Sequence, residues 1–346
     1  MKDKGLNLIE KLPTYDSYRH IAIRRRKKFS KIDYLVYRDL EKVKIPPAFD
    51  DFLFADYNDN KKRNSRILIF ASEKAREHLK YGKTFFGDGT FENCPRPFKQ
   101  LYVVFCDLGS SEGTNNVVPV IYALLPNKFG KSYSIMFEII KSQIPEWAPN
   151  KFIMDFEPAP ITAIRNVFPE IKLHGCFFHF QDRLKKKAKK LTIIKRNTKT
   201  NKIVSLCIVL PLLPEANIDE GLHYILKENK VMGSNNKLEL FLSYVQDHWM
   251  PKKALWCTFG ERHRTNNVCE GWNGQFNKSL KKRPTILHLL KILKKDAMFH
   301  AVNAVTSEPA KKRSKPVVDR NTYIQHVQMQ LITGEIDVPL FMEKLR

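Results

Sequence analysis

The chain has 346 residues, of which 43% are hydrophobic, so it is long and apolar enough to bury a core as one large domain or as two. This composition excludes a largely disordered protein. No apolar run reaches the ~18 residues that a membrane helix needs, and the first residues lack the apolar segment of a secretory signal. Six scattered cysteines without a Cys-x-x-Cys pair predict a reducing compartment rather than a disulfide framework.

The charge of the chain is strongly positive and unevenly distributed. Lys and Arg total 60 against 36 Asp and Glu, which gives a formal net charge of +24. Residues 183–202 contain ten basic residues and no acidic one, and shorter basic clusters lie at 24–28, 281–283 and 311–313. Such clusters release counterions when they contact phosphates, so the expected partner is a nucleic acid. The alternative is a set of solvated charged faces.

The first predicted elements lie in the N-terminal half. Residues 1–80 read as helical and irregular, with a boundary at the Pro46-Pro47 pair. Apolar runs then predict three strands, at 84–88, 101–107 and 117–125. The last two are expected to form a hairpin, because the segment between them, GSSEGTNN, is rich in turn residues. Apolar residues at helical spacing predict a helix over 132–144, with Ser132 as its cap.

The remaining elements alternate between strand and helix. They are a strand at 151–155, a helix at 159–167, a strand at 171–176 and a helix through the basic run. This order predicts an α/β fold with a mixed sheet. A helical insertion is expected at about 203–250, and an amphipathic helical stretch interrupted at Pro284 is expected over 266–298. The region from 301 to 346 is expected to be a loosely packed basic tail.

Two carboxylates stand at predicted strand ends. Asp88 lies between Gly87 and Gly89 at the end of the first strand, and Asp155 ends a later one. Strand ends in the middle of a sheet lie close together, and neighbouring carboxylates repel each other unless a cation lies between them. Magnesium prefers oxygen ligands of this kind. A third acid from a helix would complete a two-metal site for attack on a phosphodiester.

Each carboxylate also has an ordinary structural interpretation. Asp88 followed by Gly89 is typical of a tight turn. Asp155 can serve as the N-cap of the helix that follows it, and Glu157 is a competing acid two residues further on.

Seven short motifs in order give the sequence a specific resemblance. They are FGDGTF at 86–91, PFKQLY at 97–102, PVIYALLPNK at 119–128, DFE at 155–157, AI at 163–164, FP at 168–169 and GCFFHF at 175–180. Together they resemble the MULE (Mutator-like element) transposase domain of the DDE transposase superfamily, and among its members the animal proteins that carry a FLYWCH zinc finger. The resemblance is close over 84–190 and extends in organisation over about 10–300. It implies an RNase H-like fold.

The resemblance also implies roles for individual acids. Asp88 and Asp155 match the first two metal ligands, and Glu270, in the setting Asn266-Asn267-Val268-Cys269-Glu270, matches the third. These three would hold two Mg²⁺ ions, with Mn²⁺ as an alternative. Glu270 three residues after Asn267 is also the pattern of a helix capping box. Glu261 is the next candidate for the third acid.

Cys176 and His179 form a Cys-x-x-His pair. Two ligands do not make a zinc site, and Cys257 with His263 does not supply a convincing second pair, so we expect no structural zinc. The simple interpretation is a buried thiol and a histidine at a helix start. The resemblance implies that both are accessory residues, with His179 close enough to the active site to contact DNA or to orient Asp155.

The sequence departs from the family in two zinc-binding modules. No cysteine precedes Cys94, so a Cys/His finger is not expected there, and no SWIM zinc motif follows Glu270. The chain is therefore expected to be a domesticated or truncated copy, or one that uses its basic helices to bind DNA.

These observations predict a nuclear DDE transposase that cleaves and joins DNA strands. The three expected regions are 1–80, a catalytic domain over 81–300 and the tail over 301–346; the oligomeric state, including a homo-oligomer, stays open. Expected phosphate contacts are Arg183, Lys185, Lys186, Lys187, Lys189, Lys190, Arg262, His263 and Arg264. Trp272 is expected either to stack on an unpaired base or, more simply, to belong to the core. The alternatives are a catalytically inactive, transposon-derived nuclear DNA-binding protein and a nuclease outside transposition.

Overall fold

The computed structural model describes residues 37–59, 65–194, 199–232, 236–280, 282–306 and 311–346. The basic cluster predicted at 24–28, the middle of the basic run at 195–198 and Lys281 lie outside these ranges.

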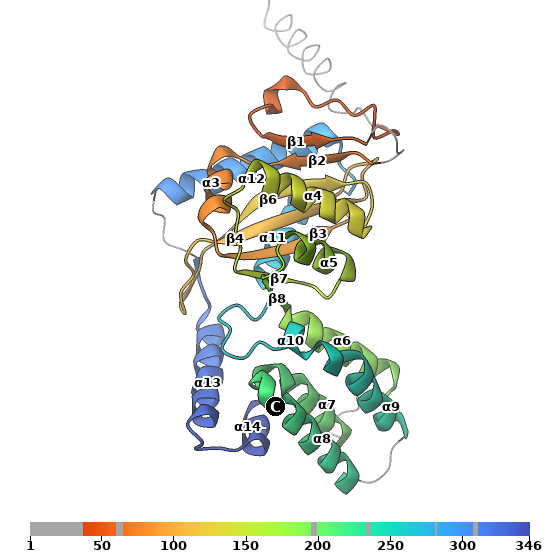
Figure 1. Ribbon diagram of the computed structural model, residues 1–346, viewed down its shortest axis with the longest axis vertical. Coiled ribbons are helices and arrows are strands. Elements are labelled where there is room, and N and C mark those ends of the chain that lie inside the picture. Colours follow the sequence, from red (N-terminus) through yellow and green to blue (C-terminus); the bar gives the residue numbers. More distant parts are fainter. Residues whose placement is uncertain (1–36, 60–64, 195–198, 233–235, 281, 307–310) are drawn as a thin grey trace, which may run out of the picture.

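A seven-stranded mixed sheet forms the centre of the upper part of the molecule (Figure 1), in the order β1-β2-β6-β4-β3-β7-β8. The strands are β1 (Leu53–Tyr57), β2 (Ile67–Phe70), β6 (Val117–Leu125), β4 (Gln100–Asp107), β3 (Thr84–Thr90), β7 (Lys151–Met154) and β8 (Lys172–Gly175). Pairing is antiparallel from β1 to β3 and parallel from β3 to β8. The predicted α/β class with a mixed sheet and the β4–β6 hairpin are confirmed, and the architecture is compatible with an RNase H-like fold.

Alternating side chains give this sheet two buried faces. Phe85, Tyr102 and Phe152 lie on the face covered by α3 (Glu73–Tyr81), α4 (Gly130–Gln143) and α5 (Pro158–Val167). Phe86 and Ile153 lie on the opposite face, against α11 (Asn267–Ser279) and α12 (Ile286–Thr306). Successive strand residues point to opposite faces, so the central strands β3, β4, β6 and β7 contribute to both cores.

A helical body lies below the sheet (Figure 1). It contains α6 (Phe177–Lys190), α7 (Lys199–Val209), α8 (Ile218–Met232), α9 (Asn236–Tyr244), α10 (Lys253–Trp256), α13 (Lys315–Ile332) and α14 (Val338–Leu345). Trp249 and Phe341 are buried in its common core. The two-stranded ladder of β5 (Thr114–Asn115) with β9 (Lys311–Lys312) ties the start of α13 to the hairpin loop.

Three local expectations are wrong. Residues 53–57 and 67–70 are strands rather than helical or irregular structure, because β2 is entirely buried and pairs with β6. Ser132 does not cap α4, which begins at Gly130; its hydroxyl donates to Oδ1 of Asn127 at 2.8 Å. The region after residue 301 is not a loosely packed tail, since Val327 and Phe341 are fully buried. The domain boundaries themselves stay a prediction.

The length and polarity of the helices show whether any of them could span a membrane. Within the described ranges, none of the helices combines the length and the apolar character that crossing a bilayer requires.

Candidate active site

Asp88 lies inside β3, which continues to Thr90, so it is not in a turn. Gly87 and Gly89 point to the opposite face of the strand. A Cβ on Gly87 would lie 2.2 Å from the hydroxyl of Tyr102, and one on Gly89 would lie 1.8 Å from Nε2 of Gln100. The glycines therefore leave room for the side chains of Tyr102 and Gln100 on β4. The Asp88 carboxylate faces α11 and accepts a hydrogen bond from Nδ2 of Asn273 at 2.7 Å.

Asp155 follows β7 directly, next to Asp88. Gly87 pairs with Met154 across the parallel β3–β7 ladder. Asp88 and Asp155 each follow one residue later, so they lie side by side. Oδ1 of Asp155 accepts the N–H of Phe156 at 2.6 Å. The residue that precedes α5 is Glu157, so Asp155 is not its N-cap.

Glu270 is in the first turn of α11, and the capping box is absent. Asn267 belongs to the helix itself, and no side chain caps its N-terminus. Oε1 of Glu270 lies 3.5 Å from Nε2 of His179, and Nδ1 of the same ring lies 3.8 Å from Oδ1 of Asp155. His179 thus lies between two of the three predicted acids.

Two backbone contacts hold His179 in this position. The N–H of Phe177 donates to the carbonyl of Arg264 at 2.8 Å, and the N–H of Asn266 donates to Sγ of Cys176 at 3.4 Å. The start of α6 is therefore fixed against the segment that leads into α11. Burial raises the pKa of the Cys176 thiol to about 11.

The electrostatics of the site reflect its crowding. Burial raises the pKa of Asp88 to about 6; the N–H of Gly89 and His179 lower it, and Glu270 and Asp155 raise it further. Burial and Asp155 likewise raise the pKa of Glu270, against the effect of His179. The β3–β7 register, the bond from Asn273 of α11 to Asp88 and the two contacts of His179 bring the three carboxylates into one region, where a bound cation would relieve their repulsion.

Several atoms in the site are available as metal ligands. Oε1 of Glu270 and Nδ1 of His179 are buried and have no hydrogen-bond partner within the described structure. One ligand atom each from Cys176, His179 and Glu270 lies within 4.8 Å of the others. The carboxylates of Asp88, Asp155 and Glu270 suit a hard divalent cation, and the imidazole and the thiol suit softer ions.

The predicted phosphate contacts on α6 divide into two groups. Arg183 lies at the site itself, with Nη2 3.3 Å and 3.5 Å from the two carboxylate oxygens of Asp155. The side chains of Lys185, Lys186, Lys189 and Lys190 are exposed, and Lys186 pairs with Asp182 at 2.7 Å. Lys187 is half-buried over the ring of Tyr244.

Glu261 lies elsewhere, in an ion cluster with Lys151, Lys172 and His174. Lys151 contacts its carboxylate, and Nζ of Lys172 and Nε2 of His174 lie at 3.1 and 3.3 Å. Burial raises the pKa of this carboxyl, but bonds from His174 and Lys151 outweigh that effect and hold it below its ordinary value. The geometry therefore favours Glu270 over Glu261 as the third acid.

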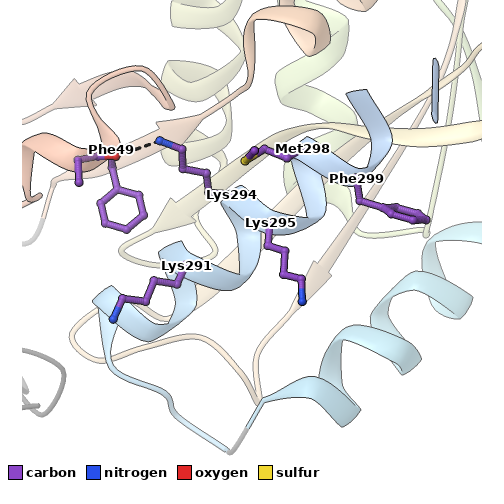
Figure 2. A pocket seen from close by; sticks show the side chains of 7 residues that line it. Phe49, Lys291, Lys294, Lys295, Met298 and Phe299 are labelled. Atoms are coloured by element: carbon purple, nitrogen blue, oxygen red, sulfur yellow. Dashed lines mark hydrogen bonds between the residues drawn. The ribbon is translucent and has the colours of Figure 1, made fainter. Parts of the chain in front are cut away.

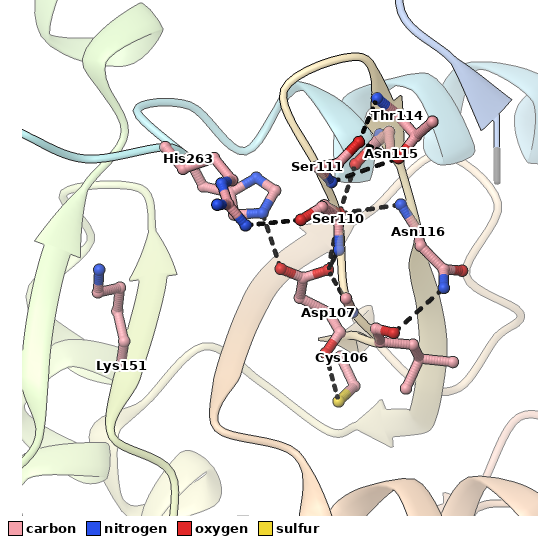
Figure 3. Close-up of polar contacts among 12 residues, drawn as sticks. Cys106, Asp107, Ser110, Ser111, Thr114, Asn115, Asn116, Lys151 and His263 are labelled. Carbon is pink, nitrogen blue, oxygen red and sulfur yellow. Dashed lines mark hydrogen bonds and ion pairs between the residues drawn. The ribbon is translucent and has the colours of Figure 1, made fainter.

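The segment before α11 is anchored to the hairpin loop (Figure 3). Nε2 of His263 lies 2.9 Å from Oδ2 of Asp107, and Nη1 of Arg262 donates to the carbonyl of Ser110 at 2.6 Å. Burial raises the pKa of Asp107, but bonds from His263 and Ser110 lower it to about 2. His263 is committed to this contact, and Arg264 donates to Oδ1 of Asn321.

Trp272 belongs to the core rather than to a base-stacking surface. Its ring stacks on Phe276 with centroids 4.4 Å apart, and its Nε1 donates to Oδ2 of Asp296 at 3.0 Å. Asn273, by contrast, is a site residue that the sequence interpretation missed. The sequence feature that could have indicated Asn273 is its spacing: residues three apart in a helix are neighbours on its surface, so Asn273 lies next to Glu270.

A cavity of about 580 Å³ lies along α12 (Figure 2), apart from the acids. Phe49, Met298 and the aliphatic parts of lysines line it, and Lys294 donates to the carbonyl of Ala48 at 2.9 Å. No carboxylate is among its described lining residues, so it does not compete with the acidic cluster as a catalytic site.

One comparison with known proteins gave a match. The family model described as the MULE transposase domain matches residues 85–183, a range that includes Asp88, Asp155, Cys176, His179 and Arg183. This segment is a MULE transposase domain, and the family expected from the sequence is confirmed. No curated protein matches the chain. Glu270 lies outside the matched range.

Proposed function

We propose that the chain is a DDE-type MULE transposase, whether an intact, a domesticated or a truncated copy, and that it uses divalent metal to cleave and join DNA strands. In this proposal the sheet with its flanking helices is an RNase H-like catalytic core, and the helices between α6 and α11 are an insertion in it. The observation that carries the proposal is the placement of Asp88 and Asp155 on neighbouring strands beside α11, which carries Glu270, with His179 between Asp155 and Glu270. A nuclear location follows from a chromosomal substrate and stays a prediction.

Each residue of the cluster has a role in this proposal. Asp88, Asp155 and Glu270 would hold Mg²⁺ or Mn²⁺, which supplies activation of water or a 3′-hydroxyl and stabilisation of the leaving oxygen. Asn273 fixes the carboxylate plane of Asp88 through its 2.7 Å bond. His179 lies beside both Asp155 and Glu270 and would help to position these two carboxylates.

One contact favours the rival function, a DNA-binding protein without catalysis. Arg183 lies against both oxygens of Asp155, so a guanidinium neutralises this carboxylate without any metal. In an enzyme, Arg183 would move from Asp155 to a DNA phosphate when metal binds. In the rival, the ion pair would persist and metal affinity would be weak.

The test combines metal binding with cleavage. Asp88→Asn, Asp155→Asn and Glu270→Gln should each abolish Mg²⁺-dependent cleavage of duplex DNA and weaken Mg²⁺ binding in calorimetry. DNA affinity should be retained or raised, because a charge that repels phosphate is removed. Glu138→Gln, on the exposed face of α4, is the control. If any of the three variants cleaves like the parent, its assignment is wrong; a parent that binds DNA but not Mg²⁺ would establish the rival.

A further inference from the structure

A second, larger cavity of about 1460 Å³ lies on another side of α11, between that helix, the β4–β6 hairpin and α13. Seven lysines and arginines line it, against two aspartates among the described lining residues. Both aspartates are already engaged. Asp107 is paired with His263 at 2.9 Å, and Asp296 accepts a hydrogen bond from Tyr122 at 2.6 Å. The cavity is therefore positively charged.

Three arginines from separate segments converge on this cavity. Arg264 donates to Asn321, and Nε of Arg313 donates to the carbonyl of Thr114 at 3.3 Å. Arg320 is exposed, and the described structure gives it no hydrogen bond or ion pair. Burial, together with the charges of Arg313 and Arg320, lowers the pKa of Arg264. Like charges that a fold holds together are relieved by an anionic ligand.

The exposed surface of α11 connects this cavity to the acids. At 3.6 residues per turn, residues 274, 267, 271 and 275 lie at about 40°, 60°, 100° and 140° around the helix from Glu270. All four are exposed, and all except Gly274 line the cavity. A continuous arc of helix surface therefore runs from Glu270 to the arginine-lined cavity.

Two glycines, Gly271 and Gly274, leave part of this arc of the helix surface without side chains. A Cβ on Gly271 or on Gly274 would meet no atom within 4 Å, so no contact inside the described structure requires glycine at either position. Glycine inside a helix is destabilising relative to alanine. Glycine at a position where the described structure does not require it leaves the helix backbone open to close approach by another molecule.

We propose that a DNA strand crosses α11 over Gly274 and Gly271, from the carboxylate cluster into the cavity, where Arg264, Arg313 and Arg320 contact its phosphates. The proposal rests on the proposed function in taking DNA as the polyanion and Glu270 as the start of the path. A nucleic acid fits better than a small anion, because the basic groups are spread along a cavity of this volume rather than gathered at one point. The lysines of α6 would contact a different part of the DNA.

The test measures binding of a labelled random-sequence DNA duplex in EDTA, so that cleavage plays no part. Gly271→Leu should keep or raise the melting temperature, because leucine favours helix and has open space here, yet DNA affinity should fall by about tenfold or more. Arg313→Gln with Arg320→Gln should lower the logarithmic salt slope of binding by up to about 1.8, since each phosphate that an arginine neutralises adds about 0.9 to the slope.

The matched control is Lys227→Gln with Lys230→Gln on α8, which removes the same charge from exposed positions outside the cavity. A folded Gly271→Leu protein with parental affinity would overturn the proposal, as would an arginine double variant no weaker than the control. The same variants are also tested with a duplex RNA. If they lose affinity for the RNA but bind the DNA duplex like the parent, the choice of DNA is overturned. Because the assay needs no metal, its outcome is independent of whether Asp88, Asp155 and Glu270 support cleavage.

Discussion

Asn273 donates a hydrogen bond to Oδ2 of Asp88 at 2.7 Å, across 185 positions of sequence. This bond joins the central strand β3 to α11, the helix that also carries Glu270. It therefore fixes the orientation of one predicted metal ligand from the same element that supplies another.

Replacing Asn273 should loosen the site without dismantling it. We expect Asn273→Ala to weaken Mg²⁺ binding by about 10–100-fold, the usual effect of removing a residue that orients a ligand. Asn277→Ala is the control, since Asn277 is one turn further along α11 and accepts a hydrogen bond from Asn93 at 2.6 Å instead. Equal metal affinity in the two variants, measured by calorimetry, would show that the Asn273 bond does not orient Asp88.

The raised pKa of Asp88 predicts a specific pH dependence of stability in the absence of metal. Its folded value of about 6 exceeds the ordinary 3.8, so between these values the folded state keeps a proton that the unfolded state has lost. The free energy of unfolding should therefore fall as pH rises through this window and stay low above it.

Asp88→Asn should remove that penalty. In EDTA at pH 8 the variant should be more stable than the parent by on the order of 1–3 kcal/mol, and at about pH 3.5 the difference should vanish. Urea unfolding at a series of pH values measures this. If the parent is less stable than Asp88→Asn by the same free energy at about pH 3.5 and at pH 8, the raised pKa does not belong to Asp88.

The glycines beside Asp88 should be intolerant of a methyl group. Gly87→Ala places Cβ 2.2 Å from the hydroxyl of Tyr102 and 2.8 Å from the ring of Phe152, so we expect a loss of about 1–3 kcal/mol. Adding Tyr102→Phe should restore part of that stability, because the nearest clashing atom is removed and the buried hydroxyl has no partner of its own within the described structure.

Chemical unfolding of the single and double variants tests this coupling. Gly113→Ala, where a Cβ meets nothing within 4 Å, should be close to neutral. Purely additive effects of Gly87→Ala and Tyr102→Phe would mean that the two positions do not compete for the same space.

The sequence predicted the parts of the molecule that local patterns control. Alternation and helical spacing located β3, β4, β6, β7 and α11, and strand ends indicated that Asp88 and Asp155 would meet. The bond from Asn273 and the convergence of Arg264 with Arg313 were not predictable in this way. The bond depends on the packing of α11 against β3, and the convergence depends on the pairing of β5 with β9; such contacts between distant segments leave no periodic signal in either segment.

Glu261 is a residue to which the sequence pattern alone gave a possible catalytic role that contacts with distant segments do not support. By spacing it is a plausible third acid, yet β7 and β8 direct Lys151, Lys172 and His174 toward it and make it a structural ion cluster. Glu261→Gln should therefore destabilise the fold by about 1–3 kcal/mol, because the carboxylate is buried but its lysine partners are partly exposed, while the folded fraction binds Mg²⁺ with parental affinity.

The surface pair of Glu146 with Lys80 provides the comparison for this variant. Their charged groups lie 3.9 Å apart and are largely exposed, so Glu146→Gln should cost no more than about 1 kcal/mol. Weaker Mg²⁺ binding by folded Glu261→Gln protein would instead make Glu261 a candidate ligand again.

The exposed lysines of α6 should contribute to DNA binding through charge alone. Lys185, Lys189 and Lys190 are exposed beyond Arg183 on the helix that begins at the active site, whereas Lys187 is half-buried over Tyr244. Replacing these three lysines by alanine, and leaving Lys186 in its pair with Asp182, should lower the logarithmic salt slope of DNA binding by up to about 2.7, or about 0.9 for each phosphate that a lysine neutralises. Lysine clusters contact the backbone rather than base edges, so the loss should be equal for unrelated DNA sequences. Lys187→Ala alone should change the slope little. An unchanged slope in the triple variant would mean that this face of α6 is only solvated.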